Sequence, residues 1–156
     1  REYTDTYAVV GGGLRHLDRR FANAPTPYHR LIDGLWSEAM GKSERALQYY
    51  AEASTMKASS YEAYDFIVHG EWIEGEVYGS EEEAFEHIVQ QFAWFRTELM
   101  AAGNQGDARK AACESAKKAA GYSEDWLIYL NAPAGYANPQ WDEESVCSQI
   151  NELSFQ

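Results

Sequence analysis

Three histidines of this chain stand four residues from a carboxylate, a spacing that places both side chains on one face of a helix. Imidazole and carboxylate groups ligate zinc and iron, and helical metal sites combine such pairs from facing helices. The alternative is a set of solvated pairs, which are frequent in so acidic a chain. We favour the solvated pairs and predict no cofactor, with a metal-binding helical enzyme or sensor as an alternative. The metal candidates are His29, Asp33, Asp65, His69, Glu83 and His87.

Other catalytic arrangements find little support in the sequence. Cys113 and Cys147 have no histidine close in sequence, and the serines fall at predicted helix caps, so no nucleophile is favoured. The segment Val9-Val10-Gly11-Gly12-Gly13 begins like a dinucleotide fingerprint. It lacks the third spaced glycine and a following βαβ unit, so we interpret it as a turn. We therefore predict no catalytic residue and expect that the protein is not an enzyme.

The distribution of charge is the most informative feature of the sequence. The formal net charge is −12, and residues 61–98 contain ten acids against one base, Arg96. Residues 122–156 contain six acids and neither lysine nor arginine. Such a surface repels nucleic acid and anionic lipid and attracts basic proteins. We expect no direct binding to nucleic acid or membrane.

These observations predict an acidic protein-binding module, an inhibitor that engages a basic, nucleic-acid-binding protein. A structural or assembly subunit, whose apolar faces meet copies of the chain, is a second alternative. The sequence leaves the oligomeric state open. The expected partner-binding residues are Glu71, Glu74, Glu76, Glu81, Glu82, Glu86, Asp142, Glu143 and Glu144.

Two resemblances accompany this prediction. The segment from Gly75 to Ile88, dense in carboxylates between aromatics, is similar to patches on acidic phage and mobile-element proteins that mimic DNA. That resemblance implies carboxylates that replace phosphates in a basic groove. The segment from Gly34 to Ala53 resembles a tetratricopeptide helix pair, which implies two helices that cross closely, with an aromatic filling the gap between small residues. Its glycine spacing does not recur at a constant interval along the chain.

Helical signals dominate the elements that would position these residues. Thr26 and Pro27 begin a helix that Gly41 ends, and Ser43 is expected to cap the next one. Ser80 and Glu83 form a capping box for a helix that extends to Ala102. We expect a further helix over 107–120 with a face of small residues, a capped turn over 123–130 and an amphipathic helix after Pro139. The predicted small face consists of Ala108, Ala111, Ala112, Ala116 and Ala119.

A small β element is expected beside the helices. Residues 6–10 suggest a strand, and residues 66–79 alternate with a period of two, which favours a ribbon that pairs with it. Residues 14–21 are expected to form a short basic helix. The sequence therefore predicts a mainly α single domain over 1–156, a bundle of five to seven helices with a small β-hairpin or ribbon.

The two cysteines bear on where the protein works. Cys113 lies just off the alanine face and Cys147 on the apolar side of the last predicted helix, so both favour burial as free thiols. No apolar run is long enough for a membrane span, and no signal segment is visible. We therefore expect reduced thiols and a cytoplasmic protein, in the host cytoplasm if the gene is viral. A disulfide in an exported chain is the alternative.

Overall fold

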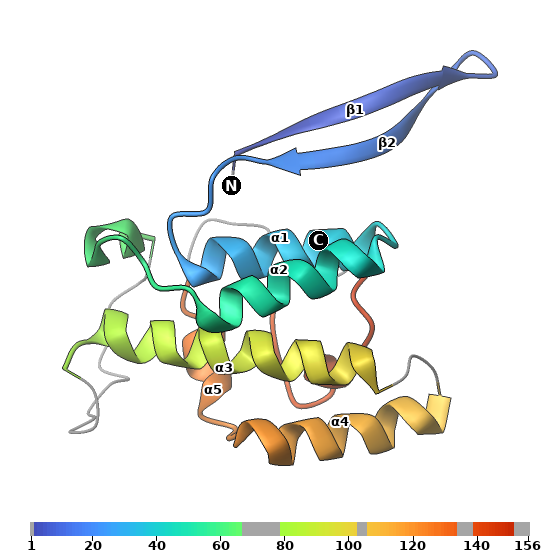
Figure 1. Ribbon diagram of the computed structural model, residues 1–156. Helices are drawn as coiled ribbons and strands as arrows, with labels where there is room; N and C mark the ends of the chain where they lie inside the picture. Colours follow the sequence, from blue (N-terminus) through green and yellow to red (C-terminus); the bar gives the residue numbers. More distant parts are fainter. Residues whose placement is uncertain (1, 67–78, 103–105, 134–138, 152–156) are drawn as a thin grey trace.

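The computed structural model describes residues 2–66, 79–102, 106–133 and 139–151. In this part of the chain five α-helices form a helical body, and a two-stranded antiparallel hairpin projects from it (Figure 1). This confirms the mainly α fold with a small β-hairpin. None of the described helices is long and apolar enough to cross a membrane.

The hairpin consists of β1 (Tyr3–Val10) and β2 (Gly13–Phe21). Gly11 and Gly12 connect them with φ angles of 58° and 83°, which both central residues of a tight type I′ turn require. The prediction of a helix over 14–21 is therefore wrong, since this turn folds those residues back to pair with β1. The predicted ribbon partner for residues 6–10 falls almost entirely on 67–78, outside the described residues.

The first two helices, α1 (Pro27–Ala39) and α2 (Ser43–Thr55), form the predicted close pair. The Thr26 hydroxyl accepts a hydrogen bond from the His29 amide at 3.3 Å, which confirms the cap. Gly41, at a φ of 72°, ends the pair's first helix. Ser43 is not the cap, because the helix already begins at Ser43 and Lys42 precedes it without a side-chain bond.

Gly34 and Tyr50 account for the close approach of α1 and α2. A Cβ atom on Gly34 would lie 2.5 Å from Cε1 of Tyr50, whose ring is fully buried against the glycine backbone. Real Cβ atoms do not approach carbon so closely, so only glycine fits at this crossing. This is the arrangement that the resemblance to a helix pair implied.

The longest helix, α3 (Glu81–Ala101), supplies the centre of the core. It contacts α1, α2, α4 and α5, and it lies between the α1–α2 pair and α4 in Figure 1. The Ser80 hydroxyl accepts from the Glu83 amide at 3.1 Å, and the Glu83 carboxylate accepts from the Gly79 amide at 3.0 Å. These two bonds confirm the predicted capping box. Its buried apolar side chains are Ala84, Phe85, Ile88, Val89, Phe92, Ala93, Phe95 and Leu99.

The remaining elements are α4 (Gly106–Ala120), α5 (Trp126–Leu130) and two 3₁₀ turns, η1 (Tyr61–Tyr64) and η2 (Ser145–Cys147). Of the predicted alanine face of α4 only Ala112 and Ala116 are buried. The buried face of α4 also includes Cys113 and Ala120.

The amphipathic helix predicted after Pro139 does not form in the described residues. Its place is taken by η2 and extended chain, and Ser148 has a ψ of 153°. The carbonyls of Val146, Cys147 and Ser148 accept hydrogen bonds from arginines instead of from their own segment. Tertiary contacts therefore replace the helix that the sequence pattern favoured.

Candidate interaction surfaces

The structure does not gather the predicted metal candidates. The His29 Nδ1 atom lies 2.7 Å from the Thr26 hydroxyl, whereas Asp33 accepts from Arg30 at 3.1 Å. The Asp33 side chain is fully buried, so the predicted solvated pair is wrong at this position. In residues 2–66, 79–102, 106–133 and 139–151, no group of three His, Cys, Asp or Glu side chains could hold a metal ion.

The other two pairs give no metal site either. Glu83 serves the capping box, and His87 is half-buried on α3 beside a shallow pocket that Gln90 and Trp94 also line. Asp65 is exposed, and its predicted partner His69 lies outside the described residues.

Two groups of carboxylates, all but Glu83 predicted to bind a partner, lie near tyrosines. In the first, the Tyr61 ring is 48% exposed beside the N-terminus of α3. The pKa of Tyr61 is raised above its ordinary value. Desolvation contributes most, and the nearby charges of Glu83, Glu86 and Glu82 add to it. An exposed aromatic ring thus lies among carboxylates at this end of α3. We call Tyr61, Glu81, Glu82 and Glu83 the Tyr61 cluster.

Glu86 does not belong to the exposed surface. Its side chain is buried, and its carboxylate accepts hydrogen bonds from the Tyr64 hydroxyl and from the Ala58 amide, the latter at 2.9 Å. Burial raises the pKa of Tyr64 above its ordinary value, and the bond to Glu86 raises it further. Glu86 therefore anchors η1 to α3 and is unavailable to a partner, contrary to the prediction.

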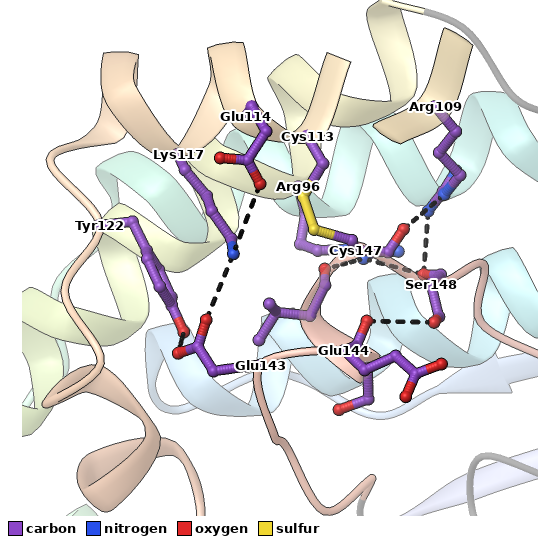
Figure 2. The surroundings of a disulfide bond; sticks show 12 residues. Arg96, Arg109, Cys113, Glu114, Lys117, Tyr122, Glu143, Glu144, Cys147 and Ser148 are labelled. Atoms are coloured by element: carbon purple, nitrogen blue, oxygen red, sulfur yellow. Dashed lines mark hydrogen bonds and ion pairs between the residues drawn. A yellow bond between two sulfur atoms is a disulfide. The ribbon is translucent and has the colours of Figure 1, made fainter. Parts of the chain in front are cut away.

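The second cluster lies where the chain after Pro139 meets the end of α4. The Glu143 carboxylate accepts from the Tyr122 hydroxyl at 2.8 Å and lies 3.4 Å from Nζ of Lys117 (Figure 2). Glu144 is exposed, and the Asp142 carboxylate accepts from the amide of Ser145, the first residue of η2, at 2.7 Å. We call Tyr122, Asp142, Glu143 and Glu144 the Tyr122 cluster. Glu71, Glu74 and Glu76 lie outside the described residues.

The arginines of the helical body are engaged inside the molecule, whereas four of its lysines, Lys42, Lys57, Lys110 and Lys118, are exposed. Arg30 lies 3.1 Å from both Asp33 and Glu52, and Arg45 lies 2.7 Å from Asp18. Lys117 contacts Glu143 and Glu114. Because the exposed acids outnumber the exposed lysines, carboxylates dominate the outward field. The exposed acids of the body include Glu44, Glu62, Glu98, Asp107, Glu124, Asp125 and Glu144.

A buried ion pair holds the chain after η2 against the helices. Nη2 of Arg96 lies 2.8 and 2.7 Å from the two carboxylate oxygens of Glu38, and Tyr50 donates to the same carboxylate at 2.7 Å. Arg96 also donates to the Val146 carbonyl, and Glu38 accepts from the Ile150 amide. Desolvation opposes ionisation of Glu38, but the Arg96 charge and its hydrogen bond outweigh it and lower the pKa.

The predicted free thiols are contradicted by the structure. Cys113 and Cys147 form a disulfide with their Cα atoms 5.6 Å apart, joining α4 to the chain after Pro139 (Figure 2). Arg109 donates to the Cys147 carbonyl at 2.7 Å and to the Ser148 carbonyl at 2.9 Å. These arginine bonds keep Cys147 over α4, within reach of Cys113. Both positions were correctly expected to be apolar, but sequence does not show that they adjoin.

The sequence predicted a strand over residues 6–10 but not its partner β2, so the surface of this hairpin was not predicted. Arg19 fixes its base: the guanidinium lies 4.3 Å from the Trp36 ring centroid and 2.7 Å from the Asp5 carboxylate. The hydrogen bond from Arg19 lowers the pKa of Asp5 to about 2. Farther out, Val9 and Leu14 are 76% and 75% exposed and face each other across the strands. Large exposed apolar side chains on the hairpin are Tyr3, Tyr7, Val9, Val10, Leu14 and Leu17.

Comparison with protein-family models, curated proteins and solved structures finds no match to this chain. The signal that could have found the hairpin is the glycine pair between Val10 and Gly13, flanked by apolar residues on both sides. No comparable signal marks Arg96 and Arg109, since long-range hydrogen bonds leave no local pattern.

Proposed function

We propose that this protein is a non-enzymatic binding module whose exposed carboxylates engage a basic partner protein. The observation that supports this most is the imbalance at the surface of the helical body. Its arginines pair with internal partners, whereas Tyr61, Glu83, Asp142, Glu143 and Glu144 are exposed. Glu81 and Glu82 are half-buried at the same end of α3. Carboxylates fixed on capped helices and turns lose little freedom on binding, and a nearby tyrosine adds contact area.

The partner of such a surface is a protein that ordinarily binds phosphates, so the module acts as its inhibitor. Carboxylates held at fixed positions take the place of phosphates in a basic groove, and complementary charge speeds association. The disulfide removes the argument for a reducing cytoplasm, because such bonds persist in oxidising compartments. We therefore place the basic partner, a nuclease included, in such a compartment.

The test uses a fluorescently labelled polyarginine peptide as a defined basic probe. The variant Glu81→Gln/Glu82→Gln removes two charges from the Tyr61 cluster and leaves the capping carboxylate of Glu83 intact. The control Glu44→Gln/Glu98→Gln removes two exposed charges elsewhere; one of them, Glu44, lies in the first turn of a helix, as both Glu81 and Glu82 do. We expect the cluster variant to weaken binding roughly threefold to tenfold and the control to change it less.

The dependence of the binding affinity on salt concentration tests whether charges of the Tyr61 cluster contribute to binding. Binding of the unaltered protein should weaken between low and physiological ionic strength, and the cluster variant should show a shallower dependence. If the two variants lost the same amount of affinity, binding would depend on the net charge of the protein and not on the Tyr61 cluster. Binding that responds neither to salt nor to these substitutions would overturn the electrostatic proposal.

A further inference from the structure

β1 presents an outward backbone edge. In the described residues the sheet has two strands only, so each strand has one edge without a strand partner. β2 is the strand nearer the helices: Arg45 donates to Asp18 and to the Arg19 carbonyl, and Phe21 contacts the Tyr49 ring. In Figure 1, β1 is the strand farther from α1 and α2. The outer edge of the hairpin therefore belongs to β1.

This edge has neither lysine nor proline, and the register shift between Thr6 and Tyr7 leaves the unpaired residue, Leu17, on β2 and not on β1. Natural edge strands carry lysine, proline or inward charges that block another strand. Residues 6–14 contain no charged residue and no proline, and Val9, Val10 and Leu14 are largely exposed. A two-stranded hairpin is marginal by itself and gains stability from further strands with an apolar face. Among residues 2–66, 79–102, 106–133 and 139–151, no strand pairs with the outer edge of β1.

We propose that β1 of one molecule pairs antiparallel with β1 of a second copy, so that two hairpins form a four-stranded sheet. Self-pairing is symmetric, and like charges that oppose each other would destabilise it. The single charge in β1 is Asp5, which Arg19 and His16 already contact within the hairpin. β2 carries Arg15, Asp18, Arg19 and Arg20, so its edge is less suited to the same symmetric pairing.

Charge also selects the direction of pairing. The helical bodies are acidic and repel each other, so the favoured arrangement keeps them apart. Antiparallel strands place the two bodies at opposite ends of a strand of eight residues, which spans roughly 26 Å. Parallel pairing would bring them side by side. The one charge of β1, Asp5, already pairs with Arg19, so a basic protein gains little from this edge and the hairpin is a surface distinct from the carboxylate clusters.

The test is the mass of the full chain over a concentration series, by sedimentation or light scattering. The mass should rise from 17.7 kDa toward twice that value. Val9→Lys places a charge in the paired edge and should raise the dimer dissociation constant at least about tenfold. Ile128→Lys, at a 47% exposed isoleucine on α5, is the matched control and should leave dimerisation unchanged.

Hydrogen exchange keeps the proposal testable if Val9→Lys disturbs the hairpin itself. In the unaltered protein, β1 amides should become more protected as concentration rises, and α3 amides should not change. A monomer at all concentrations overturns the proposal. So does β1 protection that is independent of concentration, which would indicate a strand from the same chain, or dimerisation that both lysine variants weaken equally.

Discussion

At the scale of single residues, Gly34 determines how closely α1 and α2 cross. An alanine at a helix interior is ordinarily about 1 kcal/mol better than glycine. Here the added Cβ would meet the Tyr50 ring at 2.5 Å, so the helices must move apart or the ring must shift. We expect Gly34→Ala to lower the free energy of unfolding by about 1–3 kcal/mol in urea titration.

The control for Gly34→Ala is the same substitution in a Tyr50→Ala background. Removing the ring removes the overlap, so alanine should then be neutral or stabilising. A Gly34→Ala variant more stable than the original protein would show that the crossing is looser than described.

Glu38 links acidity to stability. Its pKa is lowered in the folded state, so its ionised form contributes stability that is present above the ordinary glutamate pKa of about 4.3 and is lost as pH falls through the lowered value. Removing one member of a buried pair costs about 3–5 kcal/mol. We expect Glu38→Gln to lose an amount of that order at pH 7, and its deficit to shrink as the pH falls below about 4.3.

The comparison for this prediction is Glu98→Gln, at an exposed position on α3. Chemical unfolding at a series of pH values measures both variants. A Glu38→Gln deficit that is the same at neutral and at strongly acidic pH would mean that the carboxylate contributes through its shape and not through its charge.

At the scale of elements, the disulfide fixes a segment that has little regular structure. It closes a loop over a sequence separation of 34, and loops of that size contribute about 3–4 kcal/mol. Reduction should lower the free energy of unfolding by about that amount, measured in urea with and without reductant. A Cys113→Ala/Cys147→Ala variant should be insensitive to reductant.

Thiol titration of the denatured, unreduced protein checks the bond directly. We expect no titratable thiol. Two thiols would restore the sequence-based prediction of free cysteines and with it the case for a cytoplasmic protein.

The elements also show what local sequence can predict. The caps at Thr26 and Ser80 were predicted correctly because each bond spans only three residues. The strand over 13–21 was missed because its partner, β1, and not its own pattern, determines its conformation. The helix expected after Pro139 fails for a similar reason: Arg96 and Arg109, distant in sequence, bind the carbonyls it would have used.

At the scale of the whole molecule, the sequence showed correctly which segments are acidic. It predicted only in part which of their carboxylates lie exposed at the surface. Glu86 was counted among the exposed carboxylates, yet it is buried beneath Tyr64. Glu143 is exposed but forms an ion pair with Lys117 of α4. The net charge counted over a sequence segment therefore overstates the acidity of the surface wherever folding brings segments of opposite charge together.

The Cys113–Cys147 bond also sets how the molecule extends under tension. A pull along the chain cannot lengthen the closed loop, so about 110–120 Å of contour length stays locked until the sulfur bond breaks. The hairpin, held to the body by a few side chains such as Arg19 and Arg45, yields first. Under force the β1–β2 hairpin would therefore separate from the helices, while the disulfide would keep the segment around Cys147 bound to α4.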